Sequence, residues 1–307
     1  MENDLLESIR PFLEEGGEMH PLETGVEPLT GNFKPKAVIF DIYGTLLISA
    51  SGDVEEASLI TGNLQKALDK ARIRVVTRNG LTREELLRMI LDEFKACVNR
   101  QHEKYKSENG VAYPEVDILE TWEVVVHYFI GKGFLEKGKF SNTKLLAYIF
   151  ELLSNRIYPM PGMRKVIQEI HGMDLPLGIV SNAQAYTPLF MNYYLNGNFD
   201  DNMEIEPFDP RLTIYSFREK RAKPDHQLFS LLGYSLRSNF NIAPEEAVYV
   251  GNDMLNDVYA ASQAGLKTVL FAGDQRSLRM RSEHPLVSET KPDFVVTDLP
   301  QILDIIS

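Results

Sequence analysis

The stretch FDIYGTLL, residues 40–47, begins on the last residue of an apolar run, AVIF at 37–40. Its aspartate, Asp41, stands where a buried strand would end, and Gly44 allows the chain to turn tightly behind it. At that place the carboxylate could act as a nucleophile that forms a covalent intermediate, which water later hydrolyses. An aspartate that only closes a turn by bonding nearby N–H groups would give the same pattern. The stretch therefore predicts a strand end and leaves both roles of the acid open.

Further β-rich runs follow along the chain, at 175–180, 247–250, 267–271 and 293–296. They are nearly continuous in apolar residues and are separated by helical patterns, which favours a parallel sheet covered on both faces. The carboxyl ends of such strands point toward one crevice, where open α/β sheets bind ligands. We therefore expect an α/β fold with its functional residues at that edge.

A region of different character, about 52–155, separates the first run from the second. The residues TREE at 82–85 have the form of a capping box, and apolar residues follow at spacings of three and four. Similar helical patterns cover 117–130 and begin again at Ser141, with Gly and Pro residues between them. The sequence therefore predicts an inserted all-α module. The expected organisation is an N-terminal extension with a short helix near 3–15 (1–34), a core (35–51 and 156–307) and the helical insertion (52–155).

The composition excludes several classes of function. A net charge of −12 argues against a nucleic-acid partner, because phosphate backbones are bound by basic surfaces, whereas a small anionic substrate needs only a local positive site. The single cysteine, Cys97, excludes a disulfide framework and a multi-cysteine metal site, and we expect it on the apolar face of a helix. Residues 1–18 lack the pattern of a signal peptide, and no apolar run is long enough to span a bilayer. We therefore expect a cytoplasmic protein with no membrane partner, a monomer or a homodimer.

Two other stretches carry polar residues suited to binding an anion. Ser181 and Asn182 end the second apolar run, where a hydroxyl and an amide could donate hydrogen bonds to an oxyanion or a phosphoryl group, or cap the next helix. Lys223, in RAKPD at 221–225, could neutralise a nucleophile and a substrate together. Most lysines are only solvated, so this residue predicts little by itself.

The stretch GNDMLND, residues 251–257, follows the run at 247–250 and places Asp253 and Asp257 four residues apart at an expected helix start. Two carboxylates and Asn252 on one loop suit a hard cation such as Mg²⁺, which prefers oxygen ligands. Acids at a helix start are also favoured by capping and by the helix dipole. That explanation suffices for one of the two acids.

The order of these four stretches resembles the haloacid dehalogenase superfamily, over roughly 36–50 and 156–275. The resemblance implies a Rossmann-like, doubly wound core with the helical insertion as a C1-type cap. It implies that Asp41 is the nucleophile, that Ser181 and Lys223 stabilise charge, and that Asp257 belongs to the fourth, acidic motif. Further roles that we carry over are substrate binding by Thr45, Ser181, Asn182 and Lys223, and Mg²⁺ binding by Asp41, the backbone carbonyl of Tyr43, and Asp253.

The chain departs from the phosphatase pattern of that superfamily at Tyr43, where a second aspartate usually protonates the leaving alkoxide. A phenol can donate a proton but is a poor base near neutral pH. A departing halide needs no proton, and the form Asp-x-Tyr-Gly-Thr resembles the 2-haloacid dehalogenase branch. The fourth motif matches neither branch fully. Asn252 stands where the first acid belongs in the Gly-Asp-x-x-x-x-Asp form of the superfamily, whereas Asp253 fills that role in the Gly-Asp-x-x-x-Asp form, after a shift of one residue. Met254 stands where the dehalogenases have asparagine.

Three hypotheses follow for the function. We favour Mg²⁺-dependent hydrolysis of a small phosphoester through an aspartyl intermediate at Asp41. The alternative, indicated by Tyr43, is metal-independent hydrolysis of a carbon–halogen bond in a 2-haloacid. The second alternative is a binding module that has lost turnover. The loop at 109–117 is either the part of the cap that reaches the crevice or an ordinary connection between helices.

Overall fold

A six-stranded sheet carries the four stretches described above, in a computed structural model that describes residues 2–14, 19–49, 60–197 and 204–307. The strand order is β10-β9-β8-β1-β6-β7, and every neighbouring pair is parallel. The strands are β1 (Ala37–Phe40), β6 (Leu177–Ser181), β7 (Phe208–Tyr215), β8 (Ala247–Gly251), β9 (Lys267–Phe271) and β10 (Phe294–Val296). The predicted α/β class with a parallel sheet is thus confirmed, and β1 lies centrally between β8 and β6.

Five of these strands were predicted, and β7 was not. It pairs with β6 at one side of the sheet, and the first half of its sequence, FDPR, combines two charged residues with a proline. Because Pro210 and Arg211 are exposed while Leu212 and Tyr215 are buried, the strand lacks the continuous apolar run that identified the others.

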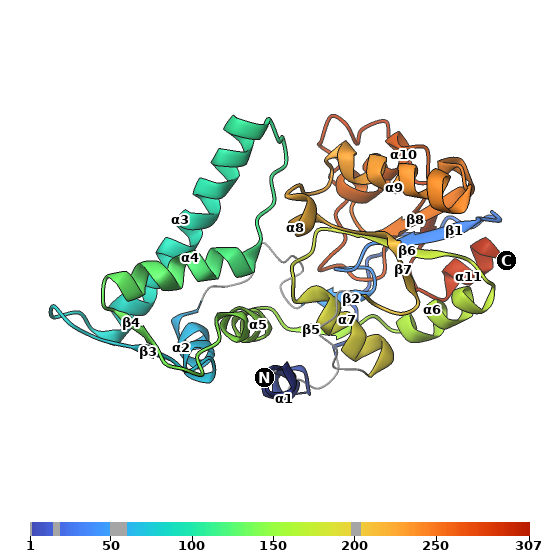
Figure 1. Cartoon of the computed structure of the whole chain (residues 1–307). Coiled ribbons are helices and arrows are strands. Elements are labelled where there is room, and N and C mark those ends of the chain that lie inside the picture. The colour runs from blue at the N-terminus through green and yellow to red at the C-terminus, as the bar shows by residue number, and fades with distance from the viewer. Residues whose placement is uncertain (1, 15–18, 50–59, 198–203) are drawn as a thin grey trace. The chain divides into compact units, whose positions relative to one another are not determined.

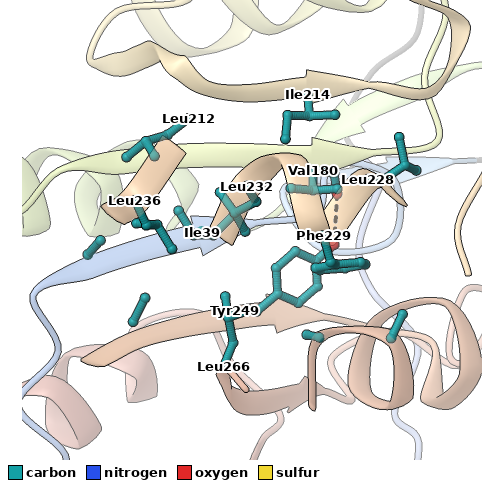
Figure 2. Packing of buried hydrophobic residues seen from close by; sticks show 14 of the residues in the cluster. Ile39, Val180, Leu212, Ile214, Leu228, Phe229, Leu232, Leu236, Tyr249 and Leu266 are labelled. Atoms are coloured by element: carbon teal, nitrogen blue, oxygen red, sulfur yellow. Dashed lines mark hydrogen bonds between the residues drawn. The ribbon is translucent and has the colours of Figure 1, made fainter. Parts of the chain in front are cut away.

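Helices cover both faces of the sheet (Figure 1). One face packs against α9 (His226–Phe240) and α10 (Ala260–Gln263), and the other packs against α6 (Met163–Gly172) and α11 (Gln301–Ile306). Figure 2 shows part of the first layer, in which Ile39, Val180 and Tyr249 from three neighbouring strands meet Phe229 and Leu232 of α9. This burial fixes the sheet, and hence the positions of the loops that leave its carboxyl ends. The short helices α7 (Thr187–Asn196) and α8 (Ser216–Glu219) follow β6 and β7, and a 3₁₀ turn, η2 (Pro244–Glu246), precedes β8.

The chain leaves and re-enters this domain through two short strands. β2 (Leu47–Ser49) follows the Asp41 turn and pairs antiparallel with β5 (Ile157–Pro159), and Met160 N donates to Leu46 O at 2.9 Å. The inserted segment is therefore anchored directly behind the turn that carries Asp41.

The inserted helices form a unit of their own with α2 (Thr61–Lys70), α3 (Arg83–Asn109), α4 (Ile118–Gly131) and α5 (Thr143–Ser154), and with the hairpin β3 (Ile73–Val75) and β4 (Leu135–Lys137). The predicted capping box is confirmed, because Thr82 and Glu85 bond each other's backbone N–H groups at the start of α3. Cys97 is buried, as expected. The third helix begins later than predicted, since Asn142 and not Ser141 caps α5.

The N-terminal residues divide between the two units. The helix α1 (Glu2–Glu14) packs against α5. The chain divides into two compact units, one of residues 1–17 and 55–156 and the other of residues 18–54 and 157–307. In the second group, Leu29 forms an antiparallel bridge with Val295, and Phe33 N donates to Ile305 O at 2.7 Å. The predicted boundary between residues 51 and 52 lies outside the described residues.

None of the helices in the described ranges has the length and apolar character needed to cross a lipid bilayer.

Candidate active site

Asp41 directly follows the central strand β1 and is held there by its backbone, which donates a hydrogen bond to Val250 O at 2.9 Å. The next residues form a compact turn in which the Ile42 carbonyl accepts from the N–H groups at 45, 46 and 47. Gly44 has a φ of 82° in this turn, and a Cβ atom there would lie 2.5 Å from Asn252 Nδ2. The turn therefore needs glycine both for its conformation and for the close approach of the fourth motif.

Lys223 joins the first and fourth motifs through its ammonium group. Nζ lies 2.7 Å from Asp41 Oδ1 and 2.5 Å from Asp257 Oδ1, and all three side chains are at least nine-tenths buried. A single buried cation is thus shared by two buried carboxylates. The structure brings together three residues that are far apart in the sequence and that we had predicted as site residues.

The charges of this cluster shift the protonation of its members. Burial raises the pKa of Asp257 to about 7, against the opposing effect of the Lys223 ammonium. Burial also disfavours the charged form of Lys223, but the carboxylates of Asp257 and Asp41 outweigh it and leave the pKa of Lys223 raised. The lysine therefore stays charged, while Asp257 can change its protonation near neutral pH.

Asn182 positions Lys223 by holding its backbone. Asn182 Oδ1 accepts from Lys223 N at 2.7 Å, and Asn182 Nδ2 donates to Lys223 O at 3.4 Å. The Asn182 amide, which we predicted to bind substrate, therefore hydrogen-bonds the backbone of Lys223 instead. Asn182 can affect a bound anion indirectly, by positioning Lys223.

Ser181, the last residue of β6, is completely buried, and its hydroxyl has no hydrogen-bond partner among the described residues. Leaving a buried hydroxyl unpaired is costly, and such groups often face a ligand or an ordered water. The strand that carries Ser181 lies beside β1, which carries Asp41. This hydroxyl is a candidate donor to a bound anion.

Tyr43 and Thr45 lie on the turn behind Asp41 and are both bonded to other loops. The Tyr43 hydroxyl shares a hydrogen bond of 2.9 Å with the Thr187 hydroxyl at the start of α7. The Thr45 hydroxyl donates to Asn252 Oδ1 at 3.2 Å, and Asn252 Nδ2 donates to Ser277 O at 2.6 Å. Thr45 is therefore a structural link between the first and fourth motifs, and Asn252 is the member of the GNDMLND stretch that contacts the Asp41 turn.

Asp253 is engaged by a cation and by a helix start. Its Oδ1 accepts from the backbone N–H groups of Leu255 and Asn256, at 2.8 and 3.0 Å, at the beginning of a π-helical turn, η3 (Met254–Tyr259), that leads into α10. Arg281 donates to both carboxylate oxygens through Nε at 2.9 Å and to Oδ2 through Nη2 at 2.6 Å. These bonds occupy both oxygens of the carboxylate.

The predicted Mg²⁺ ligands were Asp41, the Tyr43 carbonyl and Asp253. A hard cation needs oxygen atoms with open positions, and Asp253 offers none while Arg281 is bound to it. In the part of the chain that the structure describes, no cluster of three or more His, Cys, Asp or Glu side chains is arranged to hold a metal. The predicted set does not fit the ion as these side chains stand, because the site already holds a guanidinium.

Two residues of the site were missed by the sequence analysis. Tyr249, in β8, places its hydroxyl 3.0 Å from Lys223 Nζ. It was missed because a tyrosine within an apolar strand has the pattern of an ordinary core residue. Arg281 comes from the long segment between β9 and β10, which carries no motif. The parallel bridge of Arg279 with Asp253 brings that segment to the fourth motif.

Comparisons with known proteins agree with this architecture. A family model described as haloacid dehalogenase-like hydrolase matches residues 35–265. A glyceraldehyde 3-phosphate phosphatase of Pyrococcus furiosus is 33% identical over 104 residues, which is 34% of this chain and 39% of the relative. The same-named protein of Pyrococcus abyssi is 30% identical over 132 residues, 43% of this chain and 46% of the relative. The matches thus span less than half the length of either relative.

Among solved structures, a 2-haloacid dehalogenase from Pseudomonas syringae pv. Tomato DC3000 superposes with a TM-score of 0.53 at 16% sequence identity. The superposition covers 89% of this chain and 97% of that chain. At this identity the likeness is one of fold.

Proposed function

Since this chain belongs to the haloacid dehalogenase-like hydrolase family, we propose that it hydrolyses a small phosphate monoester with Asp41 as the nucleophile. The carboxylate attacks phosphorus, the bond from phosphorus to the alcohol oxygen breaks, and an aspartyl phosphate forms. The departing alkoxide takes up a proton, for which the Tyr43 hydroxyl is the candidate donor. Water then attacks the aspartyl phosphate and gives up a proton that restores the Tyr43 hydroxyl, while phosphate is released and the Asp41 carboxylate is regenerated.

The observation that carries the proposal is the buried Asp41–Lys223 pair at the carboxyl end of the central strand. Lys223 holds Oδ1 of Asp41, so we assign the attack to Oδ2. The fixed ammonium compensates negative charge that two anions bring together, and fixed charges of this kind stabilise a transition state without reorganisation. The unpaired Ser181 hydroxyl supports the proposal as a donor to a phosphoryl oxygen.

The two phosphatase relatives favour a phosphate ester over other anionic substrates. Sugar phosphates of about three carbons are therefore the first class of substrates to test. We also propose that the inserted helices, residues 52–155, serve as a cap that limits the access of water to the substrate.

Mg²⁺ is the cofactor that we propose for the phosphatase reaction, and it would supply a further positive charge at the phosphoryl group. Asp41 and the Tyr43 carbonyl remain candidate ligands, and Asp253 could join them only after Arg281 leaves. Each step of the proposed reaction uses side chains of this protein, and assays with Mg²⁺ and with EDTA measure whether the reaction requires the ion.

Tyr43 favours a second candidate, the hydrolysis of a carbon–halogen bond in a 2-haloacid. In that reaction Asp41 attacks carbon, the halide leaves without a proton, and water cleaves the resulting ester. The hydroxyl of Tyr43 is paired with Thr187, and no carboxylate stands two residues after the nucleophile to act as acid and base.

Assays with glyceraldehyde 3-phosphate, p-nitrophenyl phosphate and 2-chloropropionate, each with Mg²⁺ and with EDTA, separate these reactions. Phosphate release from either ester supports the first proposal, and halide release that EDTA does not affect supports the second. Asp41→Asn is expected to abolish either activity, whereas Asp209→Asn, at a partly exposed acid of β7 that pairs with Arg211, is the control. Full activity of Asp41→Asn would refute covalent catalysis at this residue.

A further inference from the structure

Tyr249 is a buried residue of β8 whose hydroxyl contacts three parts of the site. Its Oη lies 3.0 Å from Lys223 Nζ, 3.1 Å from Asp257 Oδ1 and 2.7 Å from the backbone carbonyl oxygen of Val180. Figure 2 shows the hydrogen bond to Val180, with the Phe229 ring packed against the Tyr249 ring. The ring is therefore fixed by packing, and the hydroxyl is the only polar atom of its side chain.

The ammonium of Lys223 has three N–H groups and three acceptors within hydrogen-bond distance. Two are the carboxylate oxygens of Asp41 and Asp257, and the third is Tyr249 Oη. With all three hydrogen bonds formed, the ammonium is held at one position by acceptors on three sides. Without the tyrosine hydroxyl, one buried N–H group loses its acceptor and the ammonium can rotate toward either carboxylate.

The same hydroxyl links two strands that do not pair with each other. β1 lies between β8 and β6 in the sheet, so Tyr249 reaches across it to Val180, the residue before Ser181. Burial, reinforced by the Asp257 and Asp41 carboxylates, raises the pKa of Tyr249 well above its usual range. The phenol therefore stays protonated. Its O–H group donates a hydrogen bond to Val180 O, and its oxygen accepts a hydrogen bond from Lys223 Nζ.

We propose that Tyr249 is a positioning residue, whose hydroxyl fixes the Lys223 ammonium beside Asp41 and ties it to the strand end that carries Ser181. The kinetic part of this inference rests on the proposed function, whereas the coupling between Tyr249 and Lys223 does not. Tyr249 has no assigned contact with the substrate and acts through Lys223.

The kinetic test compares Tyr249→Phe with Tyr215→Phe, with p-nitrophenyl phosphate as the probe. Tyr215 is the matched control, because it is also a buried strand tyrosine but its hydroxyl has no partner in the described structure. We expect Tyr249→Phe to lower kcat by about 10- to 100-fold and to change KM by less than about threefold, since a misplaced group affects the chemical step more than binding. A kcat within about twofold of that of the Tyr215→Phe protein would overturn the proposal.

A second test needs no turnover. Urea unfolding of Tyr249→Phe, Lys223→Met and the double variant gives the coupling between the two side chains. We expect the cost of Tyr249→Phe, as a change in the unfolding equilibrium constant, to be at least about fivefold smaller when Lys223 is already absent. A coupling below about twofold would overturn the proposal even if the protein hydrolyses phosphate esters.

Where Lys223→Met does not fold, hydrogen exchange decides the same question with single variants. The amides of β6 are expected to exchange faster in Tyr249→Phe than in Tyr215→Phe, because only the first variant loses the bond to Val180 O. Equal exchange in the two variants would overturn the proposal. If the wild-type protein turns over none of the probes, the proposed function fails, while the coupling and exchange results still decide the role of Tyr249.

Discussion

Replacing Lys223 by methionine tests whether one ammonium stabilises two buried carboxylates. The Lys223 side chain is 3% exposed, and those of Asp41 and Asp257 are 7% and 1% exposed, so solvent screens these pairs little. Removing one partner of a buried ion pair costs about 3–5 kcal/mol, because the other partner is left uncompensated. We expect the free energy of unfolding of Lys223→Met to fall by about this amount at pH 8.

The pH dependence of this loss follows from Asp257. Its pKa is 3.8 in the unfolded chain and about 7 in the folded one, where burial raises it. Between these values the folded state binds a proton that the unfolded state does not, so this group favours folding less as the pH rises. Because the Lys223 ammonium opposes this rise, its removal raises the pKa of Asp257 in the folded state further, so that more of the carboxyl is protonated at pH 8. The deficit of the variant is therefore expected to be smaller at pH 5.5 than at pH 8.

Urea unfolding at the two pH values, followed by far-UV circular dichroism, measures both quantities. Trp122 is the single tryptophan and lies in α4, so its fluorescence reports separately on the helical unit. Lys267→Met is the matched control, since the Lys267–Asp293 pair is 44% and 30% exposed and should contribute less than about 1 kcal/mol. A deficit below about 1 kcal/mol at pH 8, or one that grows on acidification, would refute the reasoning.

Three further substitutions probe the loops around this cluster. Gly44→Ala should lower the free energy of unfolding in urea by at least about 2 kcal/mol, because it adds a steric clash to a backbone with positive φ. Gly25, which has φ +68° and open space around it, is the control, since Gly25→Ala measures the backbone strain alone. Equal losses in the two variants would refute the clash. Arg281→Gln should lower stability by about 1 kcal/mol and make the melting temperature rise with Mg²⁺ more than in the wild type, because Asp253 is released; an unchanged response to Mg²⁺ would contradict this. Thr82→Ala should destabilise the helical unit by about 1 kcal/mol, as loss of an N-cap does, and a tryptophan-fluorescence transition that stays in place would contradict it.

The parts of this protein that sequence predicts are those in which neighbouring residues determine the structure. The apolar run before Asp41 predicts β1 correctly, and Thr82 with Glu85 predicts the start of α3. Both signals are local. The first is a run of consecutive buried residues, and the second is a capping box whose two residues are three positions apart. The outward-facing residues of β7 give no such signal, because pairing with β6 and not composition makes this segment a strand.

The buried cluster of the candidate active site is also only partly predictable from local sequence. Asp41, Lys223 and Asp257 could be predicted as site residues only from the order of the four stretches, because no stretch is decisive by itself. Their bonding could not, because Tyr249 and Arg281 enter the site from an ordinary apolar strand and from a segment without a motif. Which of two adjacent residues, Asn252 or Asp253, contacts the Asp41 turn depends on such distant partners.

The bridge between Leu29 and Val295 has a consequence for solubility. β10 ends the strand order on its side of the sheet, and the edge of a terminal strand can recruit the strands of other molecules. Leu29 occupies this edge by exchanging two backbone hydrogen bonds with Val295, at 2.9 and 3.0 Å, and Gly31 lets the segment pass the Phe294 ring closely. The bridge thus pairs part of the outer edge of β10, and we expect it to hinder edge-to-edge association at this strand.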